Sequence, residues 1–127
     1  MQEKALYEYA VIRVLPRVDR EEFLNVGVLL YCQPRNFLRS ACSINEDRLK
    51  PFVSGLRPEI LKEHLAAVER ICNGGDDAGP IGQLPIGERF RWLTAPRSTV
   101  VQTSAVHTGL TDDPEATLQD LMKKLVY

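Results

Sequence analysis

Two runs rich in Val, Ile, Leu and Tyr constrain the fold of this chain more than any other feature. Residues 6–16 read L-Y-E-Y-A-V-I-R-V-L-P and residues 25–32 read N-V-G-V-L-L-Y-C, with the polar connection R-V-D-R-E-E-F-L between them. Because strand side chains alternate between two faces, both faces of both runs are largely apolar beyond residue 9. This composition is typical of strands that are covered on both sides. We therefore predict that the two runs form the central hairpin of a sheet.

Three further segments have regular patterns. Residues 37–43 resume a β-type sequence after the turn-forming Q-P-R-N, which predicts a three-strand meander. Residues 58–72 carry apolar side chains at helical spacing, and residues 114–125 repeat this pattern after Asp113, a favourable N-cap. Both helices have one apolar face, so both should dock on the sheet.

The remaining segments are less regular. Asn45 is suited to cap a helical turn, E-D-R-L-K, and the Gly- and Pro-rich residues 76–85 are predicted to form a loop. Residues 85–94 fit a short helix or a strand. Residues 98–108 are β-branched and polar, which predicts an edge strand, bent or broken near Thr103.

These elements predict an α+β fold. It would contain an antiparallel sheet of about four strands, built on the N-terminal hairpin, with two or three helices packed on it. The 127 residues are enough for one hydrophobic core, so we expect a single domain over residues 1–127.

Composition limits the class of protein. The net charge of −1 argues against a nucleic-acid-binding footprint, so nucleic acid is an unlikely partner. No apolar run is long enough for a membrane helix, and the N-terminus lacks a signal-peptide core. Cys32, Cys42 and Cys72 form no C-x-x-C pair and are predicted to be reduced core residues. We expect a cytoplasmic protein with no membrane association, no metal site and no cofactor.

Arg13 is the strongest candidate for a binding residue. It stands among apolar residues on a predicted central strand, where a charged side chain needs an oppositely charged or hydrogen-bonding partner. A guanidinium offers a fork of donors for a phosphate or carboxylate ligand. The alternative is an internal ion pair with Glu21 or Glu22, or an exposed position at the strand end.

The connection between the two runs holds further candidates. Glu22 and Asn25, with Asp19 and Glu21, could converge as metal-binding or acid–base groups. The alternative is a solvated loop in which Asn25 serves a turn or a cap. Gly27 is more typical of a bulge or a close packing contact than of a ligand site.

A second group of candidates lies near the C-terminus. Arg97, Ser98 and Thr99 combine a guanidinium with two hydroxyls, which suits an anion cradle or simply a turn entering a strand. His107 with Ser104 or Ser98 and a carboxylate could be drawn as a catalytic triad, but no G-x-S-x-G motif supports it. Trp92 and Phe90 lie between arginines and could stack on a base, although a core aromatic pair is the commoner arrangement.

Several segments resemble the uncharacterised bacterial family known as domain of unknown function 3037. They are Y-A-V-I-R-V-L-P (residues 9–16), E-F-L-N-V-G-V-L-L-Y-C (22–32), R-F-R-W-L-T-A-P-R-S-T-V-V-Q (89–102) and V-H-T-G-L (106–110). The resemblance implies no established activity. It does imply a possible protein partner, a kinase-like neighbour resembling the HipA toxins. It also marks Arg13, Glu22, Asn25, Gly27, Arg97, Ser98, Thr99 and His107 as positions to probe.

Two hypotheses for function follow. The first is a small interaction or accessory module, with the kinase-like protein as the partner that the resemblance implies, because no catalytic constellation is present. The alternative is a binding protein or enzyme for a phosphorylated small molecule, with Arg13 and Arg97 as an arginine clamp. Placement of these two arginines on opposite sides of the sheet would argue against the clamp.

Overall fold

The computed structural model describes residues 3–15, 23–49, 58–97 and 100–127. It confirms the predicted α+β fold, with an antiparallel sheet and helices packed on it. The strands are β1 (Ala5–Val14), β2 (Leu24–Cys32), β3 (Phe37–Cys42), β4 (Val101–Thr103) and β5 (His107–Thr111).

The N-terminal hairpin organises the sheet. β1 pairs with β2, and β2 pairs with β3, so the predicted meander is present. The short helix η2 (Gln33–Arg35) and Asn36, whose φ is +49°, make the turn from β2 to β3. The sheet order is β3-β2-β1-β4, and β5 also pairs with β1.

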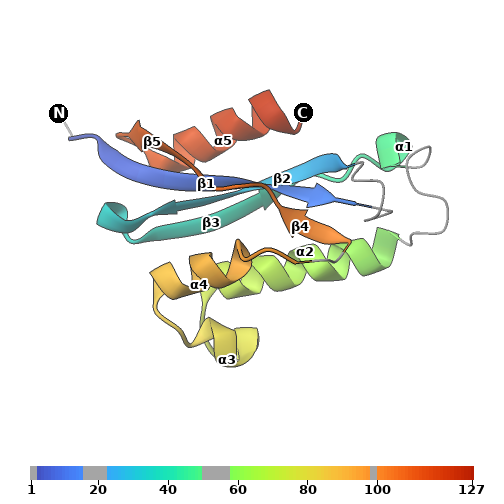
Figure 1. Cartoon of the computed structure of the whole chain (residues 1–127), viewed down its shortest axis with the longest axis horizontal. Helices are drawn as coiled ribbons and strands as arrows, with labels where there is room; N and C mark the ends of the chain where they lie inside the picture. Colours follow the sequence, from blue (N-terminus) through green and yellow to red (C-terminus); the bar gives the residue numbers. More distant parts are fainter. Residues whose placement is uncertain (1–2, 16–22, 50–57, 98–99) are drawn as a thin grey trace.

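Helices cover both faces of the sheet, as the apolar faces of the hairpin require (Figure 1). Helix α5 (Pro114–Leu125) packs on one face, where Leu118 and Met122 join Val28 and Leu30 of β2 in a buried cluster. Helices α2 (Pro58–Asn73) and α4 (Ile86–Leu93) lie on the other face. There the core includes Ile12, Leu29, Leu61, Phe90 and Leu93.

The predicted helix starts follow their capping chemistry. The side chain of Asp113 accepts a hydrogen bond from the backbone N–H of Ala116, 3.2 Å away, at the start of α5. Asn45 accepts one from the backbone N–H of Asp47 (3.1 Å) at the start of α1 (Glu46–Leu49). Of the two structures that fitted residues 85–94, the helix is the one that forms.

The described part of the predicted edge strand, residues 100–108, is broken after Thr103, as predicted, into β4 and the start of β5. Ser104 fills the break: its backbone N–H donates to the carbonyl of Val11 (2.8 Å), and its hydroxyl accepts from the Val11 N–H (2.8 Å). The hydroxyl also donates to the carbonyl of Ala105 (2.9 Å). A side chain thus replaces one step of the ladder, and both pieces of strand stay against β1.

Two predictions need correction. The segment 76–85 is not a plain loop, because it contains η3 (Asp76–Ala78) and α3 (Gly79–Gly82). Cys42 is exposed and not in the core, unlike Cys32 and Cys72, because it ends the outermost strand of the sheet. No helix in the described part of the chain is both long and apolar enough to cross a membrane.

Candidate functional site

Arg13 and Asn25 lie opposite each other where the register of β1 and β2 shifts. Ile12 pairs with Gly27, whereas Arg13 pairs with Asn25, which leaves Val26 as an extra residue on β2. The guanidinium of Arg13 stacks on the ring of Phe23, 4.0 Å from its centroid. Asn25 donates from Nδ2 to the carbonyl of Leu125 (3.1 Å) and so ties β2 to the end of α5. Arg13 Nε and Asn25 Oδ1 are buried, and no residue that the structure describes forms a hydrogen bond with either atom.

Arg97 lies on the other side of the sheet. Its guanidinium stacks on Trp92, 4.0 Å from the ring centroid, and donates to the Trp92 carbonyl. Trp92 belongs to α4, which covers the face opposite α5, whereas Asn25 and its neighbour Arg13 face α5. The structure therefore does not bring Arg13 and Arg97 together as a clamp.

Most of the other predicted site residues lie outside the part of the chain that the structure describes. Glu22, Ser98 and Thr99 lie outside the described residues, as do Asp19 and Glu21. His107 is exposed on β5, with its ring 5.2 Å from that of Tyr9 across the strand pair. Within the described ranges, no group of three His, Cys, Asp or Glu side chains is placed to hold a metal ion.

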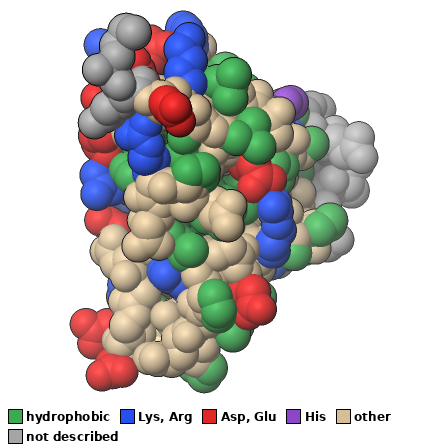
Figure 2. Space-filling model, turned by 90° about the vertical axis from the view of Figure 1, so that its left-hand side faces the viewer, with side chains coloured by type: hydrophobic (Ala, Val, Ile, Leu, Met, Phe, Trp, Pro, Cys, Tyr) green, Lys and Arg blue, Asp and Glu red, His purple; other side chains and the backbone are tan. Residues whose placement is uncertain are grey.

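The arginines near Trp92 bind groups of the protein itself. Arg89 donates to the carbonyls of Ile71 and Cys72 (both 2.8 Å) and of Leu84 (3.0 Å). Arg91 forms a two-pronged ion pair with Glu8, with distances of 2.9 and 3.0 Å. On the face seen in Figure 2, charged side chains of both signs are interspersed with hydrophobic ones. This face lacks the continuous basic surface that nucleic acid requires.

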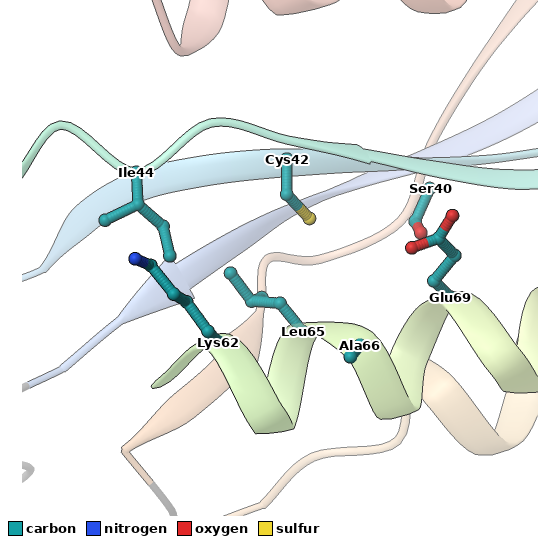
Figure 3. Close-up of a pocket in the computed structure, with 7 residues that line it drawn as sticks. All are labelled: Ser40, Cys42, Ile44, Lys62, Leu65, Ala66 and Glu69. Atoms are coloured by element: carbon teal, nitrogen blue, oxygen red, sulfur yellow. The ribbon is translucent and has the colours of Figure 1, made fainter. Parts of the chain in front are cut away.

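A groove between β3 and α2, with a volume of about 480 Å³, is open to a ligand. Figure 3 shows Ser40, Cys42 and Ile44 on the sheet side of the groove, facing helix α2. The helix contributes Leu65 and Ala66 to its centre, with Lys62 towards one end and Glu69 towards the other. We call these seven residues the β3–α2 groove.

The strand beside this groove is an edge of the sheet. Cys42 pairs with Gly27, and the next residue, Ser43, donates its N–H to the carbonyl of Val26 (2.8 Å). Bonded and non-bonded pairs alternate in an antiparallel ladder. The backbone groups of Leu38, Ser40 and Cys42 must therefore point away from β2. No described residue forms a backbone hydrogen bond with them.

The two edges of the sheet differ in how they are protected. The edge beyond β1 consists of two short strands, β4 and β5, interrupted at Ser104. Short and broken edges resist pairing with another chain. β3 is an unbroken six-residue strand without Pro or Gly, and its charged residue, Arg39, pairs with Glu115 on the α5 side. The β3 edge is thus the one suited to accept a further strand.

The thiols near the groove are held in the neutral form. Lost hydration within the groove, together with the Glu69 carboxylate, raises the pKa of Cys42 to about 11, although the residue as a whole is exposed. Burial raises the pKa of Cys72 to about 12, against a smaller opposing effect of a hydrogen bond with Ser40. Neither thiol is activated as a nucleophile, because the thiolate is the reactive form.

Residues 9–126 match a protein family of unknown function, DUF3037. The chain belongs to this family. No curated protein and no solved structure matches it. The resemblance predicted from the sequence is therefore confirmed, and it covers all five strands except the first residues of β1.

None of the groove residues of this DUF3037 protein was among the sites predicted from its sequence. The sequence predicts Ser40 and Cys42 only as strand residues, and Lys62 and Glu69 only as part of a helix. The sequence contained one signal of a strand that could accept a further strand, because residues 37–42 contain neither Pro nor Gly. What the sequence did not show is that this strand would be the outermost one, beside α2.

Proposed function

We propose that the protein is a small interaction module that binds an extended segment of a protein partner at the β3 edge. The observation that carries this proposal is the unpaired backbone of Leu38, Ser40 and Cys42 beside the β3–α2 groove. In strand addition, main-chain hydrogen bonds supply affinity and pockets beside the edge supply specificity. An edge strand with an adjoining groove meets both needs.

The kinase-like neighbour implied by the family resemblance is the partner we propose to test first. We also propose a cytoplasmic location, where the three unpaired cysteines would stay reduced.

The alternative, an enzyme or binding protein with an arginine clamp, has no matching observation, because Arg13 and Arg97 lie on opposite faces of the sheet.

The test compares two substitutions of Ser40 in an affinity pull-down from host lysate, read by mass spectrometry. Ser40→Pro removes one outward N–H. It breaks no hydrogen bond to β2, because the backbone groups of Ser40 point away from β2, and proline is tolerated on an edge strand. Ser40→Ala keeps that N–H and is the matched control, because both variants lose the Ser40 hydroxyl. We expect the wild type and Ser40→Ala to retain a stoichiometric partner, the kinase-like neighbour, and Ser40→Pro to lose it.

Circular dichroism and thermal unfolding of both variants show whether each is folded. A folded Ser40→Pro variant that retains the partner as well as Ser40→Ala does would contradict binding at the β3 edge.

A further inference from the structure

We infer that the β3–α2 groove selects a segment that adds antiparallel to β3 and whose groove-facing residues are acidic, apolar and basic, in that order from its N-terminus. This inference rests on the proposed function and adds the chemistry and the direction of the partner segment. It follows from the charges at the two ends of the groove, its apolar centre and the opposite directions of β3 and α2.

The two ends of the groove carry opposite charges. Lys62 lies beside Ile44, and Glu69 lies beside Ser40 (Figure 3). Lys62 forms an exposed 3.4 Å ion pair with Glu46, which is too weak to compete strongly with a ligand. Glu69 is exposed and forms no ion pair with any residue that the structure describes. One end therefore suits a carboxylate and the other a cation.

The centre of the groove is apolar. Leu65 and Ala66 come from α2, the Cys42 thiol on the β3 side stays neutral, and Ile44 extends the apolar surface towards the Lys62 end. A small branched apolar side chain fits between them without leaving a polar group unpaired.

Spacing sets the pattern of the segment. Lys62 and Glu69 are seven residues apart on α2, a rise of about 10 Å. Side chains on one face of a strand recur about every 7 Å, at alternate residues. Residues i and i+4 of a bound strand are about 13 Å apart, and the long Lys and Glu side chains cover the difference. The apolar residue then falls at i+2, over Ala66 and Leu65.

Direction follows from the order of residues along β3. The strand runs from Leu38 past Ser40 to Cys42, so Glu69 lies nearer its start and Lys62 nearer its end. An antiparallel segment enters beside Lys62 and leaves beside Glu69. Antiparallel pairing is slightly more stable than parallel pairing, and every strand pair in this sheet is antiparallel. The acidic residue therefore comes first.

A second copy of this chain does not fit the same edge well. Its own β3 would offer Leu38, Ser40 and Cys42 to the groove, and none of these carries a charge for Lys62 or Glu69. We therefore choose a segment of a different protein as the occupant.

The test is an NMR titration of the ¹⁵N-labelled full chain with two end-blocked synthetic peptides. The first is Thr-Glu-Thr-Val-Thr-Lys-Thr, and the second has Glu and Lys exchanged. We expect the wild type to bind the first peptide about tenfold more tightly, with shifts at the amides of Leu38, Ser40 and Cys42. In the double variant Lys62→Glu, Glu69→Lys, the preference should reverse.

The matched control exchanges the charges of the two residues that directly follow Lys62 and Glu69 on the same helix. Glu63→Lys with Arg70→Glu keeps the spacing of seven residues and the net charge, but neither residue lines the groove. This control should keep the wild-type preference. The control places charges of the same order as Lys62 and Glu69 beside them, so a general field effect would raise the preference several-fold in the control. That result would overturn the inference.

Three further outcomes show whether this inference, the proposed function or both are wrong. If both peptides bind equally, or neither binds, while Ser40→Pro still loses the natural partner, the charge pattern is wrong and strand addition stands. If the peptides bind and Ser40→Pro leaves their affinity unchanged, both proposals fail. Concentration-dependent dimerisation through the β3 amides would identify a second copy as the occupant and overturn the inference.

Discussion

The hydroxyl of Ser104 accepts a hydrogen bond from the backbone N–H of Val11, 2.8 Å away, at the point where β4 has ended and β5 has not begun. Val11 lies in the middle of the central strand and is 6% exposed, and Ser104 is equally buried. Without this hydroxyl, the Val11 N–H would have no partner. A polar side chain in the core is thus explained by the break in the sheet edge.

We expect Ser104→Ala to lower the free energy of unfolding by about 1–3 kcal/mol, because it leaves a buried donor unsatisfied. Urea denaturation followed by circular dichroism measures the change. Thr108→Ala, at an exposed position on β5, is the control and should change the stability by less than about 0.5 kcal/mol. Equal stability of Ser104→Ala and the wild type would mean that the Val11 N–H finds another partner.

Gly27→Ala should destabilise the protein by about 1–3 kcal/mol through overpacking. A β-carbon at Gly27 would lie 2.6 Å from the carbonyl oxygen of Ala41 and 2.8 Å from Cys42 Sγ. The sulfur can be removed by Cys42→Ala, but the carbonyl belongs to the backbone of β3. We therefore expect the double variant to recover only part of the loss in urea denaturation. Full recovery would place the clash at the thiol alone.

Arg89→Gln should cost more stability than Arg91→Gln. Arg89 supplies hydrogen bonds to three backbone carbonyls, including those of Ile71 and Cys72 near the end of α2. A hydrogen bond from a charged group contributes about 1.5–3 kcal/mol, and because Gln keeps a donor that can replace part of this set, we expect a loss of about 2–4 kcal/mol. Arg91 forms an exposed ion pair with Glu8, which contributes at most about 1 kcal/mol. Similar losses for both variants in chemical denaturation would contradict this ranking.

The three cysteines should differ in reactivity towards iodoacetamide in the native state. Cys42 is exposed and should be the one that is alkylated, whereas Cys32 and Cys72 are buried and should react only after unfolding. Because the pKa of Cys42 is raised to about 11, its rate should rise about tenfold per pH unit through pH 9 and 10. Peptide mass spectrometry identifies the modified site. Rapid labelling of Cys72 in the folded protein would contradict its burial.

Ionisation of Cys72 should weaken the fold at high pH. Its pKa is about 12 in the folded protein and about 9 in an ordinary thiol, so the unfolded chain releases this proton first. The stabilising contribution is therefore complete below about pH 9 and is lost as the pH rises towards 12. Unfolding free energies measured from pH 8 to 11 should fall more steeply for the wild type than for Cys72→Ala. Parallel curves would show that other groups cause the loss.

Periodicity and local chemistry determined the elements of this protein. The two-faced apolar runs at residues 6–16 and 25–32 predicted a covered central hairpin, and Asp113 and Asn45 predicted helix starts. Such features depend on neighbours in sequence, since alternation, helical spacing and capping act within a few residues. The one local exception is the segment 76–85, where Gly and Pro permit short helical turns as readily as a loop.

The tertiary structure decided which of these residues meet. Arg13 and Arg97 have similar chemistry but lie on opposite faces of the sheet, so no clamp forms. Lys62 and Glu69 face Ser40 and Cys42 only because β3 is the outermost strand and α2 packs beside it. Strand order depends on pairings between residues far apart in the chain, and local sequence carries no direct record of these contacts. The same strand in the middle of the sheet would have no free backbone and no groove.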